Sequence, residues 1–155
     1  MQADAERIRA IYNHEVLNTV ATFDLVPRSL EEQLQWLAAR SGAFTAIVAV
    51  DRGHVVGFSA LSPYKERAAY RTSVEDSIYI DHEAHGRGIG RQLLTAVLEI
   101  AANSGFHTAF ARITTSSTAS RALHTACGFE LVGIEREVGR KFGKWLDVAV
   151  MQKML

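Results

Sequence analysis

Proline, cysteine and net charge are all scarce in this sequence, and each shortage excludes a class of protein. Only two prolines occur among 155 residues, which leaves no proline-rich linker between domains. A chain of this length, 48% apolar, buries one substantial core and is too short to suggest two. Its single cysteine, Cys127, makes no internal disulfide, in agreement with a reducing compartment. We therefore expect one domain over residues 1–155.

Charge of one sign and long apolar runs are missing as well. Seventeen basic residues balance seventeen acidic ones, so no net field holds a polyanion, and we expect no nucleic-acid partner. No run reaches the roughly 18 apolar residues that cross a bilayer, and early charged residues break the apolar core that a signal peptide needs. The sequence thus predicts a cytoplasmic protein without a membrane partner.

The hydrophobic period changes along the chain. Two amphipathic helices are predicted first: Asp4 is a candidate cap for one, and Ser29 with Glu32 matches a capping box for the other, which should stop at Gly42. A strongly amphipathic helix ending at Gly105 comes later. Strands are expected at residues 44–50, 54–61, 73–80, 108–113, 129–136 and 145–154, and a short helix at 119–126. This order predicts an α/β (α+β) domain.

A glycine-rich turn, residues 85–90, lies between a predicted strand and the long amphipathic helix. Its amides suit a pyrophosphate at the helix N-terminus, and Arg87 and Arg91 add positive charge. Glycines also occur in ordinary tight turns, so the surrounding sequence must distinguish a phosphate-binding turn from a purely structural one. A nicotinamide-binding site would need an acidic residue about 20 positions on, where Ala109 and Arg112 stand, and the Gly-Lys-Ser or Gly-Lys-Thr of a triphosphate loop is absent.

The strand, glycine turn and helix resemble the acetyl-CoA loop of the GCN5-related N-acetyltransferase (GNAT) family, although His85 replaces the usual Arg or Gln. Five further blocks resemble, in order, the phosphinothricin and methionine sulfoximine acetyltransferase branch of that family. They are residues 19–23, 63–70, 72–80, 122–124 and 139–148. The resemblance implies a GNAT fold with a mixed, mostly antiparallel sheet and about four flanking helices, acetyl-CoA as cofactor, and a homodimer. Family members usually begin with a strand, and here that first strand is expected to be missing.

The resemblance also assigns residues to the cofactor. Backbone N–H groups near Ile78, Tyr79 and Ile80, where the fold splays two strands apart, should polarise the thioester carbonyl. Ser117 stands where the family usually has an Asn that steadies the cofactor, and its hydroxyl can still form hydrogen bonds. The pyrophosphate side is formed by His85, Gly86, Arg87, Gly88, Ile89, Gly90 and Arg91.

A further set resembles the acceptor side of the family. Its members are Thr22, Phe23, Lys65, Arg67 and Tyr70. The cations among them suit the anionic groups of an amino-acid analogue, while the alternative is an ordinary solvated loop. A late block, Arg140, Lys141, Phe142 and Trp145, lines either the pocket or a dimer seam, and the sequence does not choose between them.

Two residues are the candidate catalysts. Glu75 occupies the position that resembles the family's catalytic glutamate, and a half-buried carboxylate there can act as general base, directly or through water. Asp76 should face the opposite side of the same strand. His124 lies where many relatives carry a Tyr near the sulfur, and it suits proton donation to the thiolate or a share in amine deprotonation. The alternatives are a solvent-facing strand-end carboxylate for Glu75 and a buried, hydrogen-bonded residue for His124.

Other interpretations remain beside a small-molecule N-acetyltransferase. The enzyme could instead acetylate a protein N-terminus or a polyamine, or the chain could be a non-catalytic acyl-CoA-binding module. His82 and His85 flank an acidic residue, but no further ligand is spaced to complete a metal site, so none is expected. Cys127 ends a predicted helix as a small buried residue, and nothing marks it as a nucleophile.

Overall fold

The computed structural model describes residues 2–155 of the chain. The helices are α1 (Ala5–Asn18), α2 (Leu30–Ala38), α3 (Ile89–Asn103) and α4 (Thr118–Ala126), with short 3-10 turns at Gln2–Asp4, Ala68–Tyr70 and His82–Ala84. The strands are β1 (Ala46–Asp51), β2 (His54–Pro63), β3 (Ser73–Ile80), β4 (Thr108–Thr114), β5 (Glu130–Lys141) and β6 (Lys144–Met154). None of the helices in the described part of the chain is both long and apolar enough to span a membrane.

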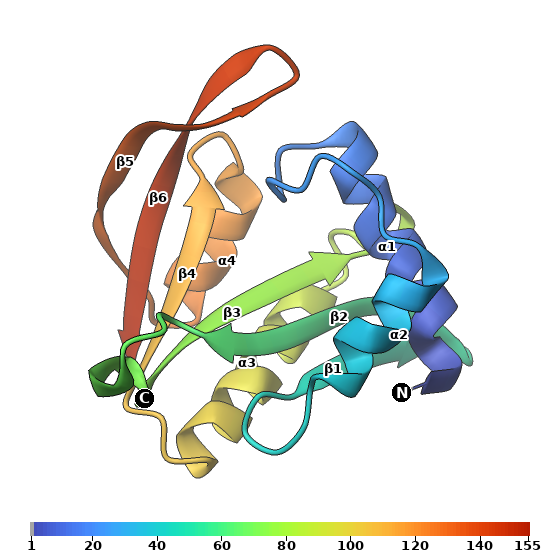
Figure 1. Ribbon diagram of the computed structural model, residues 1–155, viewed down its shortest axis with the longest axis horizontal. Helices are drawn as coiled ribbons and strands as arrows, with labels where there is room; N and C mark the ends of the chain where they lie inside the picture. The colour runs from blue at the N-terminus through green and yellow to red at the C-terminus, as the bar shows by residue number, and fades with distance from the viewer. Residues whose placement is uncertain (1) are drawn as a thin grey trace.

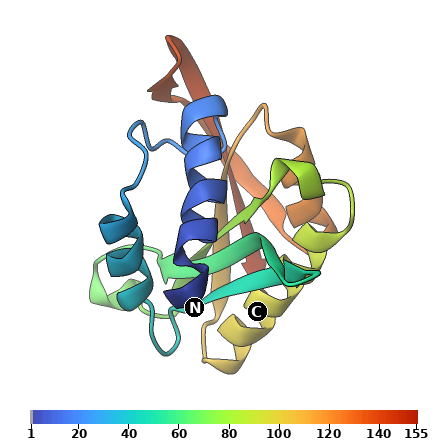
Figure 2. The ribbon, with the colours of Figure 1, turned by 90° about the vertical axis from the view of Figure 1, so that its right-hand side faces the viewer.

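The strands form one six-stranded sheet in the order β1-β2-β3-β4-β6-β5. Only β3 and β4 run parallel, and every other neighbouring pair is antiparallel, which confirms the mixed, mostly antiparallel sheet. Helices α1 and α2 cover one face and α3 and α4 the other (Figures 1 and 2). Within residues 2–155 no strand precedes α1, so β1 forms the edge of the sheet on that side.

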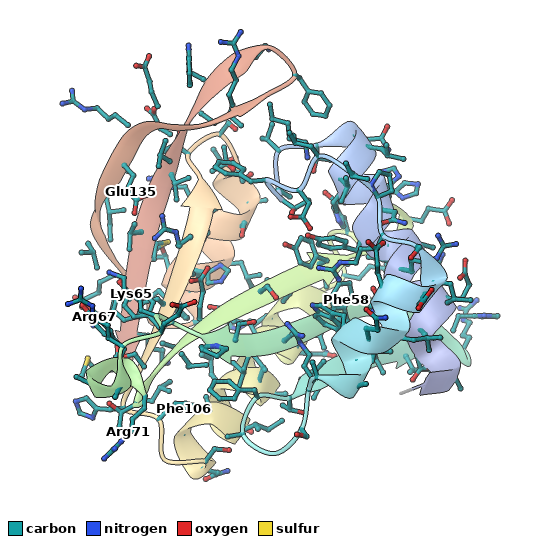
Figure 3. The ribbon with its side chains drawn as sticks, in the orientation of Figure 1. Phe58, Lys65, Arg67, Arg71, Phe106 and Glu135 are labelled. Carbon is teal, nitrogen blue, oxygen red and sulfur yellow. The ribbon has the colours of Figure 1, made fainter. Side chains whose placement is uncertain are left out.

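Two apolar cores hold the helices to the sheet. On one face, the stripe of α3 packs through Leu94 and Val97 against Leu61 and Val74 of the strands, all of them fully buried. On the other face, Phe58 lies under α1 and α2, as Figure 3 shows. Strand β2 is therefore covered on both faces, by the core of Leu61 on one side and that of Phe58 on the other.

The predicted start of α2 is confirmed, whereas the end of α2 and the cap of α1 differ from their predictions. Ser29 accepts a hydrogen bond from the Glu32 amide, and the Glu32 carboxylate accepts one from the Ser29 amide. The helix ends at Ala38, before Gly42, which takes a φ of +61° in the following turn. Asp4 does precede α1, but its backbone is already helical and its side chain makes no capping hydrogen bond.

Strand β5 is longer than its pattern predicted. It continues to Lys141 and forms a hairpin with β6 through a two-residue turn in which Phe142 and Gly143 have φ values of +51° and +72°. The expected end near residue 136 coincides with a bulge, because the register with β6 shifts between Glu135 and Gly139. This bulge breaks the alternation of side chains that a prediction from sequence relies on.

Candidate active site

The cleft of this protein opens where β3 and β4 separate. The two strands pair only from Ser73 to Glu75, opposite Thr108 to Phe110, whereas β3 stays paired with β2 as far as Ile80. Beyond Glu75, the β4-facing edge of β3 therefore has no strand partner among the described residues, and Figure 1 shows the two arrows diverging. A cleft of about 620 Å³ occupies this gap. It contains Ile78, Tyr79 and Ile80, as the splayed-strand prediction requires.

One end of the cleft is formed by the glycine turn. Gly86 and Gly88 have φ values of +74° and +76°, a conformation that favours glycine, and open space surrounds both of them. The chain then enters α3 at Ile89, so the first amides of that helix face outward without helical partners. This is an arrangement suited to phosphate oxygens.

The side chains of the turn contribute unequally. His85 lines the cleft, and its Nε2 lies 3.0 Å from the Ile80 carbonyl oxygen. Arg87 instead forms an ion pair of 2.7 Å with Asp51 at the end of β1, so its charge already has a partner on the protein. Gly90 has a packing role: an added Cβ would lie 3.1 Å from Leu123 of α4.

Helix α4 presents its N-terminal turn to the same cleft. Ser117 precedes the helix, lines the cleft, and its side chain makes no capping hydrogen bond. Its amide donates to the Thr114 carbonyl at the end of β4, which fixes the turn between strand and helix. Ser117 thus lies at the cleft, and its contact with the cofactor stays a prediction.

Glu75 is the last β3 residue that pairs with β4, and it lines the cleft. Burial raises the pKa of its carboxyl, the charge of Arg112 opposes that rise, and the charges of Asp76 and Glu135 add to it. A carboxyl with a raised pKa, at the edge of a cleft, is chemically suited to accept a proton near neutral pH.

Asp76 faces the other side of β3, as strand alternation predicts, and meets His124 there. Asp76 Oδ2 lies 3.0 Å from His124 Nε2, and the two side chains are 1% and 2% exposed. The remaining nitrogen, Nδ1, lies 2.8 Å from the Ser120 carbonyl oxygen. Burial tends to lower the pKa of His124, but the hydrogen bond and charge of Asp76, helped by the Ser120 carbonyl, raise it overall.

His124 has a hydrogen-bond partner at each ring nitrogen: the Ser120 carbonyl oxygen at Nδ1 and the Asp76 carboxyl at Nε2. Both partners belong to the protein, and a carbonyl oxygen can only accept. The contact with Asp76 binds α4 to β3, which is the structural alternative considered for His124. Because His124 also lines the cleft, its part in proton transfer stays a prediction.

The residues assigned to the acceptor do not line this cleft. Thr22 and Phe23 lie beneath the β5–β6 hairpin, where Lys141 Nζ donates to the Thr22 carbonyl at 2.8 Å. Phe23 packs so closely on Gly139 that an added Cβ would collide with its ring. The neighbouring residues Val20 and Ala21 line the cleft instead.

Lys65, Arg67 and Tyr70 lie at the end of the molecule where β3 begins, and Figure 3 labels the first two. The Lys65 ammonium lies 5.3 Å from the centre of the Tyr70 ring. Tyr64 stacks on Phe110, the β4 residue opposite Glu75, at 4.1 Å between ring centres. This loop is thus anchored beside Glu75 without entering the cleft.

The late block divides between two environments. Lys141 is buried and ties the hairpin to the loop after α1, whereas Phe142 and Trp145 are exposed at the hairpin tip. The Arg140 guanidinium lies 4.9 Å from the Trp145 ring centre. None of the four lines the cleft, so the pocket alternative is not supported within the described chain.

Cys127 and the histidines around the glycine turn take structural positions. Cys127 is half-buried beside the core of α3, and its carbonyl accepts a hydrogen bond of 2.6 Å from Lys153. His82 stacks on His14 with 4.3 Å between ring centres. In residues 2–155 no three histidine, cysteine or acidic side chains converge to hold a metal ion.

Two charged residues of the cleft were not predicted from the sequence. Arg112 on β4 and Glu15 on α1 both line it. Arg112 forms an ion pair of 2.5 Å with Glu135 of β5. Strand alternation places Arg112 on the face opposite the buried Ala111. Because Phe110, on that same face, pairs with Glu75, Arg112 could be placed near Glu75 only after the pairing of β3 with β4 was known.

Comparison with known proteins places the chain in a family. It matches the Acetyltransferase (GNAT) domain over residues 1–150. The chain belongs to the GNAT acetyltransferase family. It is 38% identical to a phosphinothricin N-acetyltransferase of Streptomyces coelicolor, over 100% of this chain and 93% of that protein. It is also 38% identical to an L-methionine sulfoximine/L-methionine sulfone acetyltransferase of Pseudomonas paraeruginosa, over 97% and 88%.

Solved GNAT structures superpose closely on this chain. A phosphinothricin acetyltransferase from Sinorhizobium meliloti, in complex with acetyl-CoA, has a TM-score of 0.96 and 41% identity, covering 100% of this chain and 85% of that one. A ribosomal-protein-alanine N-acetyltransferase from Brucella melitensis has a TM-score of 0.98 and 40% identity, covering 100% and 96%. The GNAT fold expected from the sequence is thereby confirmed.

Proposed function

We propose that this chain transfers the acetyl group of acetyl-CoA to the amine of a small amino-acid-like acceptor of the phosphinothricin, methionine sulfoximine or methionine sulfone type. One observation carries the proposal: the sheet opens immediately after Glu75, so a carboxyl with a raised pKa stands at the entrance of a cleft that ends in a glycine turn. The named relatives and the structure with acetyl-CoA support this choice of cofactor and acceptor.

The residues present fit acetyl-CoA. Gly86 and Gly88 leave open space beside the N-terminus of α3, where amides can receive the pyrophosphate. The unpaired edge of β3 at Ile78–Ile80 offers backbone groups to the pantetheine arm and the thioester carbonyl. Ser117 faces the same space from α4. Acetyl-CoA supplies the activated acetyl group, and the protein supplies orientation and proton transfer.

In this proposal Glu75 is the general base. The acceptor enters as an ammonium ion and must lose a proton before its nitrogen can attack the thioester carbonyl. Glu75 accepts that proton, directly or through a water molecule, and the raised pKa brings the basicity of its carboxylate closer to that of the amine. The C–S bond of the thioester would break as the C–N bond forms, and the departing CoA thiolate would take up the second proton that the attacking nitrogen loses. Cys127 does not line the cleft, which supports direct transfer without an acetyl-enzyme. His124 is a positioning residue in this scheme.

A peptide N-terminus is the second candidate acceptor. It is favoured by the structural similarity to a ribosomal-protein-alanine N-acetyltransferase. Both candidates use the same cofactor cleft and the same base, so they differ only in what surrounds the amine. A polyamine is the third candidate acceptor, because Glu15, Glu75 and Asp76 line the cleft beside the single cation Arg112.

We also propose a homodimer, with β5 at the interface. This strand is the edge of the sheet, and it exposes Leu131, Val132 and Ile134 along its length. An exposed apolar edge is a surface that proteins usually cover. Sedimentation as a monomer at working concentration would contradict the homodimer. The cytoplasmic location stays a prediction.

The experiment that tests the function is release of free CoA thiol from acetyl-CoA with competing acceptors. Phosphinothricin, methionine sulfoximine and methionine sulfone form one group, and spermidine and a short alanine-initiated peptide form the other. Turnover with the first group alone is the expected result. Turnover with the peptide alone moves the assignment to protein N-termini, and cofactor binding without any turnover supports an acyl-CoA-binding module.

A further inference from the structure

The cleft contains one strong cation. Arg112 is the only lysine or arginine among the described residues that line it, and the acidic residues of the lining are Glu15, Glu75 and Asp76. Of these, Asp76 is already paired with His124. The cations expected from the sequence to meet an anionic acceptor, Lys65 and Arg67, lie outside the cleft. The guanidinium of Arg112 is therefore the group in the cleft that can donate two parallel hydrogen bonds to an anionic ligand.

Arg112 lies on the same face of the sheet as Glu75. Glu75 pairs with Phe110 in the parallel ladder, and Arg112 follows Phe110 by two positions, so their side chains project together. The charge of Arg112 also acts on the Glu75 carboxyl, whose pKa it lowers. An α-amino acid carries its amine and its carboxylate on one carbon atom. Such a molecule can present its amine to Glu75 while its carboxylate reaches toward Arg112.

The present partner of Arg112 is one that a ligand can replace. Its guanidinium meets Glu135 at 2.5 Å, and the two side chains are 37% and 35% exposed. Figure 3 shows Glu135 on β5, at the outer side of the sheet. Water screens an ion pair this exposed, so the pair contributes little to stability and exchanges easily. A bound carboxylate in the cleft offers the same two-oxygen geometry in a less hydrated place.

We propose that Arg112 binds the carboxylate of the acceptor, and that Glu135 holds the guanidinium in position until the acceptor displaces it. This inference rests on the proposed function and narrows it. The acceptor is then an α-amino acid with a free carboxylate, which distinguishes it from a peptide N-terminus and from a polyamine. Arg112 determines specificity, whereas Glu75 carries out proton transfer.

The test compares two acceptors that differ only in the anionic group: methionine sulfone and its carboxamide. Steady-state kinetics are measured for the wild type, Arg112→Gln, Arg112→Lys and Glu135→Gln. Arg136→Gln is the matched control, because it removes the same charge from an exposed side chain on β5 outside the cleft. We expect Arg112→Gln to raise KM for methionine sulfone about tenfold or more, and KM for the carboxamide less than about threefold.

The other variants sharpen the same comparison. Arg112→Lys keeps the charge and loses the fork, so its KM for methionine sulfone should be intermediate. Glu135→Gln removes the competing carboxylate and should lower that KM, while Arg136→Gln should match the wild type with both acceptors. Equal effects of Arg112→Gln on the two acceptors, or no effect on methionine sulfone, would overturn the proposal. If Arg112→Gln does not fold, the Arg112→Lys and Glu135→Gln results decide by the same criterion.

Calorimetric titration of methionine sulfone separates this inference from the proposed function. If the wild type acetylates neither acceptor, the proposed function fails. Binding of methionine sulfone that is lost in Arg112→Gln and kept in Arg136→Gln would then still support the carboxylate site. Equal binding by all three proteins would contradict it.

Discussion

Two adjacent carboxylates of β3 have opposite surroundings. Glu75 projects to the side of the sheet that carries the half-exposed Arg112–Glu135 ion pair, and burial raises the pKa of its carboxyl. Asp76 projects to the other side, which α4 covers, and there its Oδ2 lies 3.0 Å from Nε2 of His124. Both side chains are almost fully buried. The first carboxyl is free to exchange a proton with a ligand, and the second is committed to holding α4 on the sheet. Surroundings, and not residue type, distinguish Glu75, the proposed base, from Asp76, which holds α4 on the sheet through His124.

Breaking the Asp76–His124 pair should produce the largest effect. Asp76→Ala leaves His124 buried with an unpaired N–H and an uncompensated charge, and should lower the free energy of unfolding by about 3–5 kcal/mol. Urea denaturation measures the loss, with the exposed Glu99→Ala as control. The double variant Asp76→Leu/His124→Phe should recover much of the stability, because it removes both buried polar partners. Stability equal to the wild type in Asp76→Ala would refute this role of Asp76.

Removing the base should affect the rate and leave binding intact. Glu75→Gln keeps the size of the side chain and removes its ability to accept a proton, so kcat should fall about a hundredfold or more. The affinity for acetyl-CoA, measured by calorimetry, should stay close to that of the wild type, because the glycine turn is unchanged. An unchanged kcat would sink the assignment of Glu75.

The Asp76–His124 pair should make stability depend on pH in the neutral to alkaline range. The pKa of folded His124 lies above its unfolded value of about 6.5, so the stability it contributes is full below that value. It is lost as pH rises through the folded pKa. Unfolding free energies measured across neutral and alkaline pH should therefore fall more steeply for the wild type than for Asp76→Asn. Parallel curves for the two proteins would contradict this coupling.

The smallest expected effect tests the link between Arg112 and Glu75. Glu75 must be ionised to accept a proton, so kcat/KM should fall as pH drops through its pKa, which lies above that of an ordinary glutamate. Arg112 lowers that pKa, so Arg112→Gln should move the acid limb of the profile to higher pH. The carboxamide acceptor serves for this measurement, since its binding does not depend on Arg112. A limb that stays in place would mean that the two side chains are not coupled.

Much of the architecture could be predicted from local pattern. The capping box at Ser29, the stripe of α3 and the alternation of β3 depend on neighbouring residues, and each is confirmed. The end of β5 could not be predicted, because the bulge between Glu135 and Gly139 breaks the period that marks a strand. Local pattern fails where geometry is set by pairing between distant segments.

The site residues also divide into those that local pattern could predict and those that depend on pairing between distant segments. Glu75, Ile78–Ile80, His85, Gly86 and Ser117 were expected at the cleft and line it, because each belongs to a continuous motif. The acceptor residues Thr22, Phe23, Lys65, Arg67 and Tyr70 lie outside it. Arg112 was missed because its position beside Glu75 depends on the parallel register of two strands whose paired residues, such as Ser73 and Thr108, lie 35 positions apart in the chain. His124 was found, but its partner Asp76 on another element decides what it can do.

The most direct test of the central claim follows the acetyl group by mass spectrometry. The protein is mixed with acetyl-CoA alone, then with acetyl-CoA and methionine sulfone, and both the protein and the small molecules are weighed. Direct transfer predicts a protein of unchanged mass in both mixtures and N-acetylated methionine sulfone only in the second. A protein that gains an acetyl group in the first mixture and passes it to the acceptor would contradict direct transfer, and the absence of any acetylated acceptor would contradict the proposed activity.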